Sequence, residues 1–171
     1  MSLSFLGPQA PGSRVPLYTE AERRRRDASP WTRVQGVLAP LQFVVFLASL
    51  ALVLRWFATG EGFAAATASV LVKTALLATI MVTGSIWEKV VFGRWLFAPA
   101  FFWEDVFSMV VIALHAAYVL ALLLGRPGPA GQMAIALAAY AAYVVNAAQF
   151  LLKLRAARLD EAARGGAAVI A

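Results

Sequence analysis

Four long apolar segments alternate with short polar ones along this chain, and they predict its architecture. The apolar segments cover about 34–58, 64–92, 99–124 and 130–154. The first includes 21 consecutive uncharged residues, Val34 to Leu54, and roughly 20 such residues cross the hydrocarbon core of a bilayer as a helix. Because lipid offers the backbone no hydrogen-bond partners, a spanning segment of this kind must be helical. We therefore expect an all-α protein, an integral membrane four-helix bundle.

The residues before the first span predict a leader and a short surface helix. Residues 1–18 are rich in Pro, Gly and Ser and lack the apolar core of a signal peptide, so we expect a flexible leader. Thr19 and Glu22 have the spacing of a capping box, and the basic residues after them predict a short amphipathic helix over about 20–28 at the lipid surface. Ser29 and Pro30 fit the N-cap and first position of the next helix. The transmembrane domain then covers 19–158, and 159–171 form a tail.

Lys and Arg are distributed unevenly between the two sides of the predicted bundle. Twelve of the 15 fall before the first span, between the second and third, or after the fourth. Arg55 and Arg126 fall on the other side, and Lys73 lies inside the second span. Since loops rich in Lys and Arg stay on the cytoplasmic side, we expect both termini to be cytoplasmic. This asymmetry accounts for the net charge of +6 without a nucleic-acid partner, and membrane lipid is the partner that we expect.

The composition restricts the chemistry that is available. Hydrophobic residues make up 61% of the chain, charged residues 14%, and the mean hydropathy is +0.74, which is well beyond the range of a soluble domain. The chain has no cysteine, which excludes disulfides, thiolate metal sites and cysteine nucleophiles. Its single histidine, His115, excludes a metal site built from several imidazoles. Only a carboxylate-rich site is left open, and we predict no metal.

Polar residues inside the spans gather at one depth, in the cytoplasmic halves. Ionisable groups that face lipid are costly, so they usually face the interior of a bundle and serve a function. Each also has a structural explanation, namely pairing at the interface, an acid stabilising a helix start, or hydrogen bonding between helices. The residues are Gln35, Gln42, Glu88, Glu104, Asp105, Asn146, Gln149 and Lys153.

Helical periodicity places three polar residues of the third span on one face. At ~100° per residue, Ser108 lies about 40° and His115 about 20° from Glu104, whereas Asp105 points about 100° away and is expected to have different neighbours. His115 lies eleven residues further in, roughly 16 Å at ~1.5 Å per residue, so only a long ligand can contact both Glu104 and His115. We expect Lys73 of the second span to snorkel or to pair with lipid or a helix end.

Five motifs follow one another through the chain. They are Arg23–Thr32, Gln35–Phe43, Trp87–Gly93, Phe97–Asp105 and Tyr143–Phe150. Together they resemble the 3-vinyl (bacterio)chlorophyllide hydratases of bacteriochlorophyll synthesis, over about residues 18–163. The resemblance implies a hydro-lyase that adds water across the 3-vinyl group of a chlorophyllide to give a 3-(1-hydroxyethyl) group, in a bacterial cytoplasmic or intracytoplasmic photosynthetic membrane. It implies no separate cofactor, since the tetrapyrrole carries its own magnesium, and makes other enzymes of bacteriochlorophyll synthesis candidate partners.

The chemistry of alkene hydration suggests roles for the polar residues. Protonation of the terminal CH2 leaves positive charge on the carbon next to the macrocycle, and water attacks that carbon. A carboxyl group kept protonated by apolar surroundings suits the first step, and a carboxylate suits the second. We expect Glu88 and Glu104 to flank the vinyl group as acid and base, with Asp105 in reserve. His115 is expected to ligate the magnesium of the substrate or to orient water.

Further residues are expected to bind the substrate. Asn146 and Gln149 are predicted to orient the water or the ring carbonyls, and the aromatic residues at 101–103 to stack on the chlorin. A basic residue near the interface is expected to pair with the free propionate, because ammonium and guanidinium groups favour carboxylates. The basic candidates are Lys89, Arg94 and Lys153, and the other residues predicted to bind substrate are Gln42, Trp103 and Ser108.

Two other functions fit the same residues. A non-enzymatic pigment-binding or assembly protein of a photosynthetic membrane would use His115 and the aromatic residues, and would retain pigment without changing its vinyl group. An ion or proton pathway would use Lys73, His115 and the acids. Such a pathway needs polar groups at every depth, whereas the outer halves of the spans are nearly all apolar in sequence.

Overall fold

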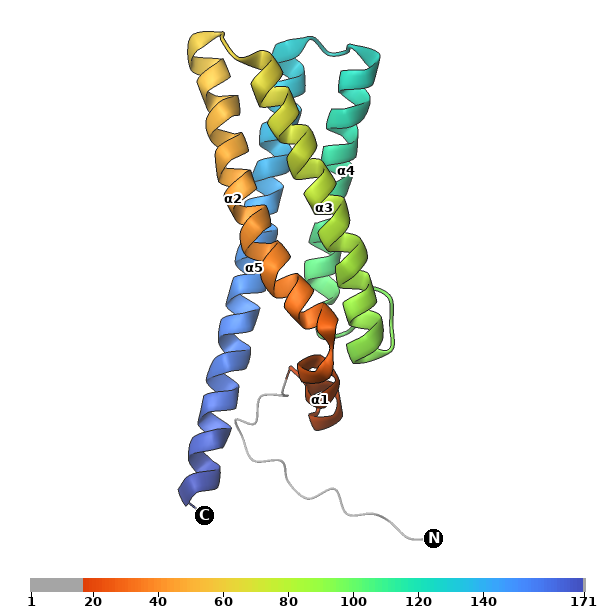
Figure 1. Cartoon of the computed structure of the whole chain (residues 1–171), viewed down its shortest axis with the longest axis vertical. Helices are drawn as coiled ribbons and strands as arrows, with labels where there is room; N and C mark the ends of the chain where they lie inside the picture. The colour runs from red at the N-terminus through yellow and green to blue at the C-terminus, as the bar shows by residue number, and fades with distance from the viewer. Residues whose placement is uncertain (1–16, 171) are drawn as a thin grey trace.

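The structure, a computed structural model, describes residues 17–170, so the leader predicted over 1–18 lies outside the described residues except for its last two positions. Every regular element in the described part of the chain is a helix (Figure 1). The helices are α1 (Glu20–Ala28), α2 (Pro30–Thr59), α3 (Phe63–Phe92), α4 (Phe102–Leu124) and α5 (Pro129–Ile170). Four of them are long and apolar enough to cross a membrane. The predicted all-α fold with four transmembrane helices and a short N-terminal helix is thereby confirmed.

The short helix α1 is capped as predicted and attached to the bundle. Thr19 Oγ1 accepts a hydrogen bond from the backbone N–H of Glu22, and the Glu22 carboxylate accepts one from the backbone N–H of Thr19. Ser29 caps α2 by accepting from the N–H of Trp31. The Arg25 guanidinium donates to the backbone carbonyl of Val91 at 2.8 Å, which ties α1 to the end of α3.

The bundle consists of two helical hairpins. α2 packs along α3 and α4 packs along α5, whereas contacts between the two hairpins are much fewer (Figure 1). At the end opposite α1, Gly60 and Gly125 terminate α2 and α4 with φ angles of 72° and 62°, in the left-handed region that glycine adopts without steric cost. The hydrophobic core between the hairpins includes the completely buried side chains of Val53, Val70, Val111, Met133 and Ala136.

The loop between α3 and α4 is longer than the sequence pattern indicated. The third span was expected to start near residue 99, but α4 begins at Phe102, and the residues from Gly93 to Phe101 form a folded loop. Phe97 in this loop has a positive φ of 58°. At the other end of the chain, α5 continues without a break to Ile170, so that the described part of the tail expected over 159–171 is helical.

The half of the bundle farther from α1 is less apolar inside than the sequence pattern indicated. The hydroxyl group of Ser49 lies 2.7 Å from that of Ser69 and 2.6 Å from that of Tyr140, and so links α2, α3 and α5. Each hydroxyl is both donor and acceptor, so this small group satisfies its own hydrogen-bonding needs inside the helix bundle.

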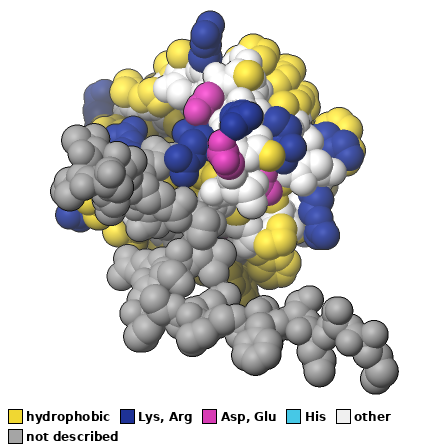
Figure 2. Space-filling model, turned by 90° about the horizontal axis from the view of Figure 1, so that it is seen from below, with side chains coloured by type: hydrophobic (Ala, Val, Ile, Leu, Met, Phe, Trp, Pro, Cys, Tyr) yellow, Lys and Arg dark blue, Asp and Glu magenta, His cyan; other side chains and the backbone are white. Residues whose placement is uncertain are grey.

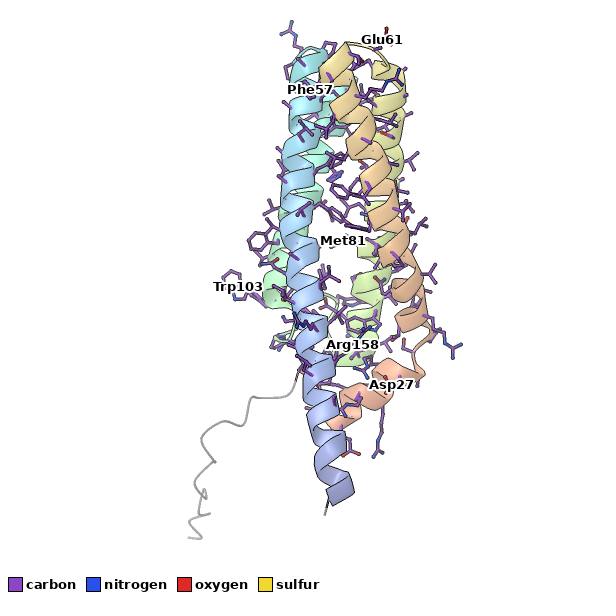
Figure 3. All side chains as sticks on the ribbon, turned by 90° about the vertical axis from the view of Figure 1, so that its left-hand side faces the viewer. Asp27, Phe57, Glu61, Met81, Trp103 and Arg158 are labelled. Carbon is purple, nitrogen blue, oxygen red and sulfur yellow. The ribbon has the colours of Figure 1, made fainter. Side chains whose placement is uncertain are left out.

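Basic side chains gather at the end of the bundle that carries α1. Figure 2, which views this end, shows Lys and Arg side chains distributed around it and acidic side chains near its centre. The opposite end carries Glu61 (Figure 3), and its neighbour Arg55 lies 3.7 Å away. The difference between the two ends is the one on which the predicted orientation rests.

Candidate functional site

Three acidic side chains meet at the end of the bundle next to α1. Glu88 comes from the last turns of α3, and Glu104 and Asp105 come from the first turn of α4. Each is at least 94% buried within the protein. With Lys153 of α5 they form what we call the acidic cluster. Glu and Asp side chains are almost never fully buried unless they are paired.

Glu88 and Asp105 are the two carboxyl groups of the cluster that lie side by side. They are close enough to interact electrostatically. Each also accepts a hydrogen bond from the loop between α3 and α4, Glu88 from the backbone N–H of Ala98 at 3.2 Å and Asp105 from that of Phe97 at 2.7 Å. The folded loop therefore aims two neighbouring amides at the carboxyl pair.

Glu104 has a different partner. Its carboxylate lies 2.5 Å from the ammonium group of Lys153, which also donates to the backbone carbonyl of Ala100 and lies 4.9 Å from the ring centre of Phe101. The expectation that Glu104 and Asp105 differ in their neighbours agrees with this arrangement. The carboxyl group placed against Glu88 is that of Asp105, which was the reserve candidate, rather than that of Glu104.

One helical turn further into the bundle lies a layer of amide and hydroxyl side chains. Asn146 Nδ2 donates to Ser108 Oγ at 2.9 Å, which links α5 to α4. The other amide atoms in this layer, Asn146 Oδ1, Gln149 Oε1 and both polar atoms of Gln42, have no hydrogen-bond partner among the described residues. Because buried polar groups are nearly always satisfied in native proteins, these atoms point to water or a ligand between the helices.

The single histidine presents an unused nitrogen to the interior. His115 is 1% exposed, and its Nδ1 lies 2.8 Å from the backbone carbonyl of Val111. A carbonyl only accepts, so Nδ1 carries the hydrogen, and Nε2 holds a free lone pair. Nε2 has no partner among the described residues. In that part of the chain no three His, Asp or Glu residues group together in a way that holds a metal ion.

Lys73 does not snorkel, and that expectation is wrong. Its side chain is completely buried, and its ammonium group lies 3.9 Å from the ring centre of Tyr143. The rings of Tyr140 and Phe46 lie 5.6 and 5.9 Å away. Lys73 faces inward because it shares the buried stripe of α3 with Val70 and Leu77. This inward-facing group was missed from the sequence.

Several predicted substrate-binding residues face outward. Trp103 is 66% exposed and projects from the side of the bundle (Figure 3). Phe102 is also exposed, whereas Phe101 is buried and stacks against Phe150 of α5. Lys89 is exposed, and its ammonium donates to the backbone carbonyl of Gly93. The structure thus buries the acids, Asn146 and His115 in the interior and leaves Trp103 and Lys89 at the surface.

Known proteins match this chain over most of its length. Residues 18–156 match the protein family described as 2-vinyl bacteriochlorophyllide hydratase (BCHF). The 2-vinyl bacteriochlorophyllide hydratase of Cereibacter sphaeroides is 71% identical over 153 residues, covering 90% of this chain and 94% of that protein. The protein of the same name from Rhodobacter capsulatus is 65% identical over 163 residues, covering 95% and 94%. No solved structure matches the chain.

The family expected from the five motifs is the family found, since "2-vinyl" and "3-vinyl" number the same substituent of the macrocycle in two systems. The match includes α1 and all four candidate spans up to residue 156, and therefore the whole acidic cluster. The chain belongs to the 2-vinyl bacteriochlorophyllide hydratase family.

Proposed function

We propose that this chain adds water to the vinyl group of a bacteriochlorophyllide, and that Glu88 and Asp105 supply and recover the proton. The observation that carries this assignment is the position of the two carboxyl groups, which are buried, close enough to interact electrostatically, and each held by a backbone N–H of the loop between α3 and α4. Two carboxyl groups held close together and away from water share one proton, because ionising both would place two negative charges side by side. The protonated group of the pair can then act as the acid and the ionised group as the base.

The reaction proceeds in two steps at this pair. The shared proton moves to the terminal CH2, and the π electrons of the vinyl group form the new C–H bond. The adjacent carbon becomes cationic, and the macrocycle delocalises its charge. Water attacks that carbon to form the C–O bond, and its surplus proton returns to the carboxylate pair, so the net change is addition of one water. A well-placed acid or base contributes about 10²- to 10⁴-fold to such a rate.

The loop between α3 and α4 supports the negative charge of the pair. After the proton leaves, the backbone N–H groups of Phe97 and Ala98 still donate to Asp105 and Glu88. Hydrogen bonds to a carboxylate stabilise its charged form. Because the folded loop fixes these donors in advance, they need no rearrangement during the reaction. The Glu104–Lys153 ion pair holds the start of α4 to α5 beside them.

The amide layer orients the attacking water. Asn146 is fixed by its hydrogen bond to Ser108, which leaves its Oδ1 to accept from a water molecule. The Oε1 of Gln149 is free to accept in the same way, and Gln42 offers both a donor and an acceptor from α2. Water held at this layer lies one helical turn from the carboxyl pair, on the inner side.

The macrocycle is accommodated between the two hairpins. These pack closely within themselves and sparsely against each other, so a flat ligand separates them at the lowest cost in lost contacts. Inside, His115 Nε2 offers a lone pair to the magnesium of the substrate, a type of bond that neutral imidazole forms readily.

A deuterium experiment tests the reaction and its order of steps. In D2O, the purified protein is expected to convert the vinyl pigment into a hydroxyethyl product with one carbon-bound deuterium, located in the methyl group, as measured by mass spectrometry and proton NMR. Deuterium on the carbon next to the macrocycle would contradict the proposed protonation step. Pigment that binds but keeps its vinyl group would identify the chain as a pigment-binding protein instead.

The acidic cluster lies at the basic end of the bundle, which supports a cytoplasmic position for it and for both termini. At that face of the cytoplasmic or intracytoplasmic membrane, other enzymes of bacteriochlorophyll synthesis deliver the substrate and remove the product.

A labelling experiment tests this orientation. The chain lacks cysteine, so the variants Glu61→Cys and Arg94→Cys each carry a single site for a thiol reagent. In spheroplasts, a membrane-impermeant maleimide is expected to label Glu61→Cys at once and Arg94→Cys only after lysis; the reverse pattern would contradict this orientation.

A further inference from the structure

Lys73 places an ionisable group in the middle of the bundle with no acidic side chain beside it. Its side chain is completely buried, and its ammonium makes no hydrogen bond to any described residue. An ammonium group removed from water is costly unless a counter-ion and hydrogen-bond acceptors replace the water. The buried ammonium of Lys73 would therefore be stabilised by a bound anion.

The chain itself cannot supply that anion at this depth. Within α3 the nearest acid is Glu88, fifteen residues from Lys73, or roughly 22 Å along the helix axis at ~1.5 Å per residue. No acid occurs elsewhere in the membrane interior. The nine acids are Glu20, Glu22, Asp27, Glu61, Glu88, Glu104, Asp105, Asp160 and Glu161, all in α1, at the helix ends or in the last part of α5.

Aromatic rings hold the Lys73 ammonium without using its hydrogen-bonding capacity. The face of Tyr143 lies 3.9 Å away, and Tyr140 and Phe46 complete an aromatic cage at 5.6 and 5.9 Å. Ring faces attract a cation electrostatically, which fixes its position. The three N–H donors remain available for an oxygen ligand.

Other polar groups without a hydrogen-bond partner among the described residues, His115 Nε2 and Asn146 Oδ1, lie near Lys73 in the bundle. The imidazole of His115 is close enough to interact electrostatically with Lys73, and its ring lies 6.0 Å from that of Tyr140. Tyr143, which contacts the ammonium, is one helical turn from Asn146 in the amide layer. The Lys73 site is therefore the inner end of the polar interior that begins at the acidic cluster.

We propose that Lys73 binds the free propionate carboxylate of the substrate, an inference that rests on the proposed function for the identity of the pigment. The macrocycle lies between the acidic pair and Lys73, with its vinyl group on the inner side of Glu88 and Asp105 and its carboxylate directed toward the caged ammonium. The interfacial Lys153 is already engaged by Glu104 and Ala100. The protein consequently selects the free acid over any pigment whose propionate is esterified.

The test compares a free acid with its ester. A vinyl pigment reduced to the ethyl compound cannot be hydrated, so its binding is measurable by fluorescence titration in the full-length protein without turnover. The wild type is expected to bind the free acid more tightly than its propionate methyl ester. Lys73→Met, which replaces the amine with an uncharged side chain of nearly the same length, should weaken binding of the free acid about 30-fold or more and leave the affinity for the ester unchanged. Lys73→Arg should retain a preference for the acid.

Matched variants and readouts separate this proposal from its alternatives. If Lys89→Met, an identical change at an exposed lysine, removes the acid preference and Lys73→Met does not, the carboxylate binds at the interface and the proposal fails. Equal binding of acid and ester by the wild type also overturns it. If the preference depends on Lys73 but the vinyl pigment is not hydrated in D2O, the carboxylate site stands and the proposed hydratase reaction is what fails.

Discussion

Glu88→Gln is expected to lower kcat for vinyl hydration by about 10²- to 10⁴-fold, the usual contribution of a positioned acid or base. The amide keeps the size of the side chain and can still occupy the site, but it can neither give nor accept the proton. The affinity for the ethyl pigment should stay within about threefold, because the interaction is used in the transition state rather than in binding. Steady-state kinetics and fluorescence titration on the purified variant measure the two quantities.

The neighbouring acids provide controls for this prediction. Asp105→Asn should lower kcat by about as much as Glu88→Gln does. The double variant should be no slower than the slower single variant, because the effects of residues that act as one unit do not add. Glu104→Gln leaves the Glu88–Asp105 pair intact. It is expected to lower the stability of the protein with little effect on kcat, since it removes the counter-ion of Lys153. Glu61→Gln, at the far end of the bundle, should leave both stability and kcat unchanged. Near-wild-type kcat in both Glu88→Gln and Asp105→Asn would refute the proposed proton donor.

Local features of the fold were predictable because they depend on local physics. The capping box of Thr19 and Glu22 and the start of α2 at Ser29 and Pro30 follow from backbone groups that only nearby side chains can satisfy. The four spans follow from the length of helix that a bilayer requires. The shared face of Glu104, Ser108 and His115 follows from the helical repeat, and all three are buried in the structure.

Pairings between helices were not predictable in the same way. Whether Glu88 meets Asp105 or Glu104 depends on the rotation of α4 relative to α3 and on a loop folded through a positive φ at Phe97. Neither is encoded in a periodicity.

The position of Lys73 was predicted wrongly because only its depth in the span was considered, and not the face of the helix on which it lies. The signal was present: Ala66, Val70 and Leu77 flank it at intervals of seven, three and four residues, and all of them are buried.

His115→Leu is expected to weaken binding of the magnesium-containing ethyl pigment about 10- to 100-fold, or ~1.4 to 2.8 kcal/mol. Leucine has a volume similar to that of histidine but has no lone pair to replace that of Nε2. Side chains of a helix lean toward its N-terminus, and for His115 that is the end of α4 at which the acidic cluster lies. Fluorescence titration measures the loss of affinity.

The metal-free form of the same pigment distinguishes ligation from packing. It has the same shape and the same propionate but no magnesium, so the wild type and His115→Leu should bind it equally. If the variant weakens both pigments alike, His115 acts by shaping the interior or by holding water, and the bond to magnesium is refuted. Equal affinity of both proteins for the magnesium pigment refutes it as well. A loss confined to the magnesium pigment, together with a shift of its bound absorption band, requires a ligand atom at this position, and His115 Nε2 is the lone pair that the bundle leaves free there.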